Sequence, residues 1–351
     1  MRKLASVQRI LAVTPIEGAD AIETAKVLGW NVVVKKGELK VGDLCIYCEI
    51  DSLMPEREEF MFLKPRGMRI RTVRLRGQVS QGICFPLSML PSYVLDTISL
   101  AGCPPLEGWD CTEYLGITKY EPPIPANLAG EVKGMFPSWL QKTDETRVQS
   151  LQPLLDKYKG QPFYVAEKLD GSSVTYYLKE GEFGVCSRNL DLKETEGNTF
   201  WKVARQMDIE NKLRMLCEEV PGSWALQGEL IGEGVQNNKY RLKGQTVYFF
   251  NLFDIDAHKY FNLNELKGGL RLMDLPIVPI VDENYALDNN IENLVALSVG
   301  KSVLNKDTHR EGIVLRPLEE TLDHEISNGH LYGDRVSFKA INPGFLLKYE
   351  E

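Results

Sequence analysis

A lysine followed by an acid and a glycine stands out in residues 166–173, which read AEKLDGSS. The alternation of residues 163–168 predicts a strand that ends at Lys168. Its amine can attack an α-phosphate only when neutral, so a pKa near ~10.4 must be lowered by a nearby cation or metal and a dry pocket. Asp170 is expected to point the same way and to hold the hydration shell of Mg²⁺, and Gly171 lets the backbone approach a nucleotide. The spacing predicts covalent nucleotide chemistry, and a surface turn is the ordinary alternative.

Segments further along the chain carry side chains suited to the same chemistry. Arg188 closes a predicted hairpin, where a guanidinium can meet a ribose or a phosphate. Glu229 lies on a predicted strand that runs into a glycine-rich turn, and the aromatic strand YFFNLFDI offers a ring for stacking on a base. Glu311 and Lys339 add an acid for metal-bound water and a cation for the α-phosphate. Taken singly, the acids are ordinary exposed residues, and Phe249 and Phe250 are expected in the core.

Taken together and in order, these segments resemble the motifs of the covalent nucleotidyltransferases, which comprise ATP-dependent RNA and DNA ligases and mRNA capping enzymes. EKLDGSS resembles motif I, SRN motif Ia of RNA ligases, GELIGEGVQ motif III, NLFDI motif IIIa, EGIVLR motif IV and SFKAIN motif V. The resemblance spans roughly residues 144–348. It implies that Lys168 forms a lysyl-AMP bond with ATP as the AMP donor, assisted by Mg²⁺ or Mn²⁺.

The resemblance also implies a role for each matching side chain. The acids that would hold the hydrated metal are Asp170, Glu229 and Glu311. The residues that would contact the nucleotide are Arg147, Glu167, Lys168, Arg188, Glu229, Phe253, Glu311 and Lys339, with Phe253 stacked on adenine and Lys339 on the α-phosphate. Many members have Lys-x-Lys in motif V, whereas the first position here is Ser337. Arg147 has an alternative reading as a helix-surface charge, because residues 144–151 look helical.

The chain is expected to form two domains. Short strand-like runs separated by turns in residues 1–120 predict a small barrel or sandwich, which the resemblance implies is an OB-like β-barrel. The proline-rich stretch 121–143 is typical of a linker. In residues 144–351, strands next to strands with a few helices predict an α+β nucleotidyltransferase domain with antiparallel sheets. Its expected elements include a hairpin about Gly181 and one helix from Asn198 to Pro221.

The order of the domains separates the branches of the superfamily. DNA ligases and capping enzymes usually place an OB domain after motif V, but only 12 residues follow Lys339 here and the β-rich part lies in front. This order favours an ATP-dependent RNA ligase that seals 3′-hydroxyl and 5′-phosphate ends or nicks through lysyl-AMP and RNA-adenylate. A DNA ligase or guanylyltransferase of the same superfamily and a degenerate RNA-binding protein are the alternatives. Retention of the lysines and acids named above speaks against the degenerate protein.

A basic run at residues 64–76 contains six cations and no acid. If the run is one strand, Arg69 and Arg71 share one face, and Arg74 and Arg76 share the other. We expect part of it to bind the phosphates of a nicked RNA duplex, which suits an OB-like domain. A solvated edge strand, protected from aggregation by its charges, is the alternative.

Composition limits the class of protein and predicts its cellular location. Hydrophobic residues make up 43% and charged residues 26% of 351, as in globular proteins, and a net charge of −8 disfavours nucleic-acid binding through bulk charge. No apolar run reaches the roughly 18 residues of a membrane helix, and the start lacks the apolar stretch of a signal peptide. Seven scattered cysteines predict reduced thiols and an intracellular location, cytoplasmic or nuclear. Cys45 and Cys48 are expected to be a buried pair.

Overall fold

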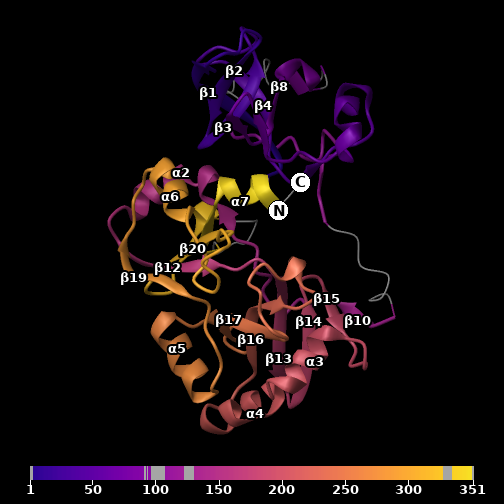
Figure 1. The fold of residues 1–351 in the computed structure, drawn as a ribbon, viewed down its shortest axis with the longest axis vertical. Helices are drawn as coiled ribbons and strands as arrows, with labels where there is room; N and C mark the ends of the chain where they lie inside the picture. The colour runs from indigo at the N-terminus through magenta and orange to yellow at the C-terminus, as the bar shows by residue number, and fades with distance from the viewer. Residues whose placement is uncertain are drawn as a thin grey trace. The chain divides into compact units, whose positions relative to one another are not determined.

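The computed structural model describes residues 3–90, 92, 94–95, 107–121, 130–326 and 334–349 (Figure 1). The chain divides into two compact units, Met1–Pro122 with Leu346–Glu351, and Pro123–Phe345. Most of the first half of the expected linker, residues 122–129, lies outside the described residues. Its second half contains strand β10 (Val132–Met135), which pairs with a strand of the second unit.

The first unit is built on an antiparallel five-stranded sheet, so the expected β-rich module is confirmed. Its strand order is β3 (Trp30–Lys35), β2 (Ile22–Val27), β1 (Ala5–Pro15), β4 (Leu44–Cys48) and β8 (Ile83–Pro86). Two smaller pairs join β5 (Ser52–Leu53) to β9 (Thr118–Lys119) and β6 (Val73–Leu75) to β7 (Gln78–Ser80). The 3₁₀ helices are η1 (Glu58–Arg66) and η2 (Leu87–Met89).

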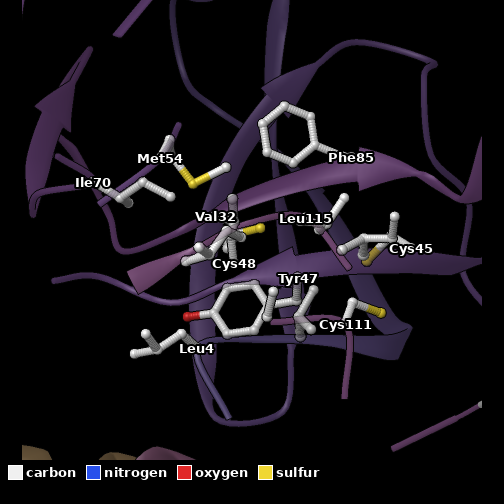
Figure 2. Packing of buried hydrophobic residues seen from close by; sticks show 14 of the residues in the cluster. Leu4, Val32, Cys45, Tyr47, Cys48, Met54, Ile70, Phe85, Cys111 and Leu115 are labelled. Atoms are coloured by element: carbon white, nitrogen blue, oxygen red, sulfur yellow. The ribbon is translucent and has the colours of Figure 1, made fainter. Parts of the chain in front are cut away.

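Strand β4 runs through the middle of this unit's core (Figure 2). Four successive residues, Cys45 to Cys48, are fully buried, so both faces of the strand are covered. Tyr47 carries the one hydroxyl among them, and its Oη donates to the carbonyl oxygen of Gln81 at 3.0 Å. The buried cysteine pair is therefore confirmed.

The second unit contains two sheets whose strands pair antiparallel, apart from the parallel pair β11 and β23. The seven-stranded sheet has the order β10, β15 (Leu190–Leu192), β14 (Glu182–Ser187), β13 (Ser172–Lys179), β16 (Trp224–Gly232), β17 (Gln245–Asp254), β18 (Lys259–Tyr260). The five-stranded sheet has the order β11 (Thr146–Arg147), β23 (Phe338–Ile341), β20 (Gly312–Pro317), β12 (Pro162–Lys168), β19 (Ile280–Ala286). A small hairpin pairs β21 (Leu322–Asp323) with β22 (Asp334–Arg335). The expected α+β architecture is confirmed.

Helices pack against one face of each sheet (Figure 1). The seven-stranded sheet packs against α3 (Thr199–Gln206), α4 (Ile209–Glu219) and α5 (Leu263–Leu272). The five-stranded sheet packs against α2 (Gln152–Tyr158) and α6 (Ile291–Ser298). The remaining helical elements are η4 (Val148–Ser150), η5 (Gln236–Asn238), η6 (His324–Ile326) and α7 (Pro343–Tyr349). Among the described residues, no helix is both long and apolar enough to span a bilayer.

Two of the expected helices differ in the structure. The helix expected over residues 144–151 is wrong, because Thr146–Arg147 pairs as a strand and Pro153 lies in the first turn of α2, where proline starts a helix rather than ending one. The helix expected from Asn198 to Pro221 is split into α3 and α4 at Asp208, whose φ is +55°. Its N-cap is confirmed, since the Asn198 side chain accepts from the N–H groups of Phe200 and Trp201.

Candidate active site

Lys168 is the last residue of β12, where the chain passes from the five-stranded to the seven-stranded sheet. Its register partner on β20 is Gly312, so the preceding residue, Glu311, lies beside it. On the other sheet, Ser173 pairs with Glu229. Both sheets turn the faces that carry these residues away from their helices. The site therefore lies between the two sheets, on the faces that point away from these helices.

Lys168 and Glu311 form a largely buried ion pair, with Nζ 2.8 Å from Oε1. Burial disfavours the ammonium, but the charges of Glu311 and Glu229 outweigh it and raise the pKa of Lys168 above its ordinary value. Burial also raises the pKa of Glu311, against the opposing effect of Lys168. The shift favours the protonated form of Lys168, which is the opposite of the lowered pKa expected for an attacking amine.

Glu229 is the second acid beside the lysine. Its Oε1 accepts the N–H of Gly171 at 3.0 Å. Burial raises the pKa of Glu229 to about 8, with Lys168 opposing the shift and Glu311 adding to it. A Cβ on Gly171 would lie 2.3 Å from the carbonyl oxygen of Leu230, so this glycine is needed for the close approach of the lysine segment to β16.

Asp170, the third acid, is held by residues that the sequence motifs did not identify. Its carboxylate forms an ion pair with Lys239, and its N–H donates to Tyr240 Oη at 2.6 Å. Both partners lie on the turn that follows the predicted glycine-rich segment. The run NNKY was a visible signal of a turn with a cation, but nothing in the chain alone shows that it meets Asp170.

The acids around Lys168 suit a hydrated cation. Within the described part of the chain, no three His, Cys, Asp or Glu side chains are grouped closely enough to hold a metal ion by themselves. Mg²⁺ usually keeps several waters and binds through one or two carboxylates together with substrate phosphates. Oxygen donors at Asp170, Glu229 and Glu311 provide that chemistry. Burial raises the pKa of Glu229 and the charges of Glu311 and Asp170 add to the shift, so a cation beside these acids would favour their ionised forms.

Lys339 lies on the same sheet as Lys168, next to Arg147 in the parallel pair of β11 and β23. Its Nζ is 3.5 Å from Oδ1 of Asp144, and Nη2 of Arg188 is 3.4 Å from the same oxygen. Burial lowers the pKa of Lys339 to about 8, with Lys168 and Arg147 acting in the same direction against Asp144. Arg147 is a buried strand residue, so its reading as a helix-surface charge is wrong.

A buried cation, Arg316, lies beside Ser337. Arg316 Nε donates to Ser337 Oγ at 2.9 Å, and its Nη2 lies 3.2 Å from Glu145 Oε1. Burial disfavours the carboxylate of Glu145, but Arg316 and Lys339 outweigh it and lower its pKa. Arg316 ends the segment that resembles motif IV, and the pairing of β20 with β23 brings it beside Ser337, a contact that the sequence alone does not show.

The aromatic side chains of β17 lie in different surroundings. Phe249 is fully buried, as expected. Phe253 is only 1% exposed and is packed with Leu140 and Tyr260, and the strand register puts it opposite Ala225, four residues along β16 from Glu229. That is a separation of about 13 Å. Tyr248 is half-buried and lies directly opposite Glu229.

Glu167 is the one predicted nucleotide contact whose side chain faces away from Lys168. Successive residues of a strand point to opposite faces, and Phe163 and Val165 on the same face as Glu167 pack against helices. The Glu167 carboxylate accepts the N–H of Val303 at 2.8 Å.

The arginines of the basic run do not lie on one unbroken strand, so the arrangement of Arg69 and Arg71 on one face with Arg74 and Arg76 on the other does not arise. Only Val73–Leu75 forms β6, and Arg76 and Gly77, with φ of +49° and +84°, make the turn to β7. Arg69 is largely buried, with Nη2 2.5 Å from Asp51 Oδ1 and its guanidinium 4.1 Å from the Tyr120 ring centre. Arg71 is half-buried, and the two exposed arginines among the four are Arg74 and Arg76.

Comparisons with known proteins agree with this geometry. A family model described as RNA ligase matches residues 161–341, and a model described as an OB-fold domain matches residues 4–87. A structure of Naegleria gruberi RNA ligase with PPi is 40% identical with a TM-score of 0.84, covering 100% of this chain and 99% of that one. A mutant of that ligase with ATP and Mn shares 40% identity at a TM-score of 0.84, covering 100% of both chains. No curated protein matches the chain.

An N-terminal OB-fold unit is followed along the chain by two sheets of mainly antiparallel strands, and a lysine and three acids lie between these sheets. This combination defines a ligase of the nucleotidyltransferase type. The chain belongs to the RNA ligase family. The expected N-terminal OB-fold is confirmed by the same comparisons.

Proposed function

We propose that this protein is an ATP-dependent RNA ligase that joins the 3′-hydroxyl and 5′-phosphate ends of RNA. The observation that carries the proposal is the placement of Lys168 within 2.8 Å of Glu311 at the crossing of the two sheets. It is supported by the family match and by full-length similarity to an RNA ligase studied with ATP and Mn and with PPi.

The reaction proceeds in three phosphoryl transfers. Lys168 Nζ attacks the α-phosphorus of ATP, a P–N bond forms, and pyrophosphate leaves. The AMP then passes to the oxygen of an RNA 5′-phosphate, which frees the lysine. A 3′-hydroxyl oxygen finally attacks that 5′-phosphate, AMP leaves, and the hydroxyl proton is lost to solvent. Positioning and charge carry most of the catalysis, because the side chains do little covalent work beyond Lys168.

The charged side chains around Lys168 have two further roles, metal binding and stabilisation of phosphate charge. Asp170, Glu229 and Glu311 would hold hydrated Mg²⁺ or Mn²⁺. A bound cation would supply positive charge that offsets the negative charge favouring the protonated form of Lys168. Lys339 and Arg188, joined through Asp144, stabilise charge on the phosphates. Arg147, beside Lys339, supports the same role.

We assign the base-facing ring to Tyr248 rather than to Phe253. Tyr248 is half-buried opposite Glu229, whereas Phe253 is enclosed in a cluster further along the strand. For Glu167, whose carboxylate faces away from Lys168, any contact with the nucleotide is made by its backbone.

For the RNA, we propose a nicked duplex whose phosphates meet the exposed Arg74 and Arg76 at the tip of the β6–β7 hairpin. Exposed arginines on an OB-fold surface bind phosphates without reading sequence. Arg69 and Arg71 are more buried, and Arg69 pairs with Asp51, so we assign the phosphate contacts to the two exposed arginines.

One experiment tests the function. The full chain is incubated with α-labelled ATP or GTP and Mg²⁺, and then with nicked duplexes that carry RNA or DNA at the 3′-hydroxyl. Label from ATP and sealing of RNA nicks are expected. Label from GTP alone would indicate a guanylyltransferase, and absence of label with every nucleotide and divalent cation would overturn the proposal.

A further inference from the structure

The turn that follows β16 contacts Asp170 and Gly171, in the segment that begins with the proposed nucleophile Lys168. Gln236 Nε2 donates to the carbonyl oxygen of Gly171 at 3.4 Å, Tyr240 Oη accepts the N–H of Asp170, and Lys239 pairs with the Asp170 carboxylate. Three contacts from one turn converge on two consecutive residues. The turn therefore sets where Asp170 lies relative to Lys168.

The turn itself is rigidly held. Gln236, Asn237 and Asn238 are consecutive residues with positive φ, which asparagine tolerates better than most residues. Asn238 bridges the turn, with Nδ2 donating to the Leu242 carbonyl at 2.9 Å and Oδ1 accepting the Leu242 N–H at 3.0 Å. Asn305 Nδ2 donates to the Lys239 carbonyl oxygen at 3.0 Å. Lys239 is thus presented from a fixed backbone.

The ammonium of Lys239 is directed at Asp170 from a nearly enclosed position. Its side chain is 10% exposed, its Nζ also donates to the Gln236 carbonyl at 3.2 Å, and it lies 5.4 Å from the centre of the Phe345 ring. Lys168 already pairs with Glu311. Two of the three acids that would hold the metal therefore have a lysine of their own in the nucleotide-free protein.

We propose that Lys239 is a positioning residue that holds Asp170 in place and competes with the divalent cation for its carboxylate. This inference rests on the proposed function, since it takes Asp170 as part of the metal site. A hydrated divalent ion and an ammonium at one carboxylate repel each other. Lys239 thus keeps Asp170 oriented while no metal is bound, and it weakens metal binding until the triphosphate adds negative charge.

The first test measures Mn²⁺ binding to the nucleotide-free protein by the EPR signal of free Mn²⁺. Lys239→Met should bind Mn²⁺ about tenfold more tightly than the wild type, because a repelling charge is removed. Lys239→Arg, which keeps the charge, should stay near the wild type. Lys243→Met is the matched control: this lysine is exposed on the same turn and should leave the affinity unchanged. Equal or weaker Mn²⁺ binding by Lys239→Met would overturn the proposal.

The second test separates positioning from substrate binding. In Lys239→Met the rate of lysyl-AMP formation should fall about tenfold at saturating ATP and Mg²⁺, with the KM for ATP nearly unchanged, because a less ordered Asp170 misplaces the metal. A raised KM with an unchanged rate would show that Lys239 binds phosphate instead, and would overturn the proposal. Lys239→Gln removes the same charge and replaces Lys239→Met if that variant does not fold. The Mn²⁺ titration needs no ligase activity. If the wild type takes no AMP label, the proposed function is refuted, and the Mn²⁺ affinities of the variants still test the role of Lys239.

Discussion

Lys168 and Glu311 are 143 residues apart in the chain, yet Nζ lies 2.8 Å from the Glu311 carboxylate. The pairing of β12 with β20 brings them together, and the negative charge of Glu311 favours the protonated form of the lysine. The contact that positions the proposed nucleophile therefore also keeps it protonated.

Removal of the amine separates the steps of the proposed reaction. Lys168→Ala should take no AMP label, because no other group replaces the nucleophile, but it should still seal a nick whose 5′ end is already adenylylated. Gel assays with labelled ATP and with pre-adenylylated RNA measure the two activities. Lys202→Ala, an exposed lysine of α3, should behave as the wild type in both assays. Labelled Lys168→Ala would place the nucleophile elsewhere.

The pKa of the nucleophile should depend on its partner. Glu311→Gln removes the closest negative charge, so the pKa of Lys168 should fall in the nucleotide-free protein. NMR of ¹³C-methylated lysines across pH follows this titration, with Lys168→Arg used to assign the signal. A Lys168 pKa that is unchanged or higher in Glu311→Gln would contradict the ion pair.

Glu229 should make the stability of the metal-free protein depend on pH. Its pKa is raised to about 8 by burial, so the folded state holds a proton that an unfolded Glu releases near its ordinary pKa of ~4.3. The resulting stability is fully present below pH ~4.3 and is lost as the pH rises through about 8.

Replacing Glu229 tests this linkage. Glu229→Gln should lose less stability than the wild type between pH 5 and 8.5, by an amount on the order of 4 kcal/mol at the upper end. Thermal unfolding of both proteins in EDTA measures the difference. Parallel pH profiles would show that Glu229 is already ionised at neutral pH.

Arg316 should matter for stability as well as for the site. It is 2% exposed and pairs with Glu145 while donating to Ser337. Arg316→Met leaves a buried carboxylate without its cation and should lower the free energy of unfolding by about 3–5 kcal/mol. Urea denaturation measures this loss. Arg214→Met, which removes an exposed helix pair with Glu210, should cost well under 1 kcal/mol; similar losses in the two variants would argue against the buried pair.

The exposed hairpin arginines should contribute to RNA binding through phosphate contacts. The double variant Arg74→Ala with Arg76→Ala should weaken binding to a nicked duplex and reduce the slope of log K against log salt by about 2. A salt series in a filter-binding assay measures it. Lys36→Ala with Lys40→Ala removes two other exposed cations of the same unit and is the control. An unchanged slope would remove the hairpin from the RNA interface.

Local patterns predicted the elements that carry the site. Alternation predicted β12, the runs at residues 224–231 and 247–255 were strand candidates that became β16 and β17, a turn signal predicted the hairpin at Gly181, and Asn198 was predicted to cap a helix. The failures came where tertiary contacts outweigh local preference. Residues 146–147 form a strand because they pair with β23. In the basic run, Arg69 pairs with Asp51 and contacts the Tyr120 ring instead of lying on a continuous strand.

The sequence by itself determined the chemistry of this protein: the type and order of Lys168, Asp170, Glu229, Glu311 and Lys339 are properties of the chain. Which charges meet was decided only by the tertiary structure. Lys239 reaches Asp170 across 69 residues and Arg316 reaches Ser337 across 21, because sheet register brings distant segments side by side. Ion-pair energies depend on separation and burial, and neither quantity is written in the order of the residues.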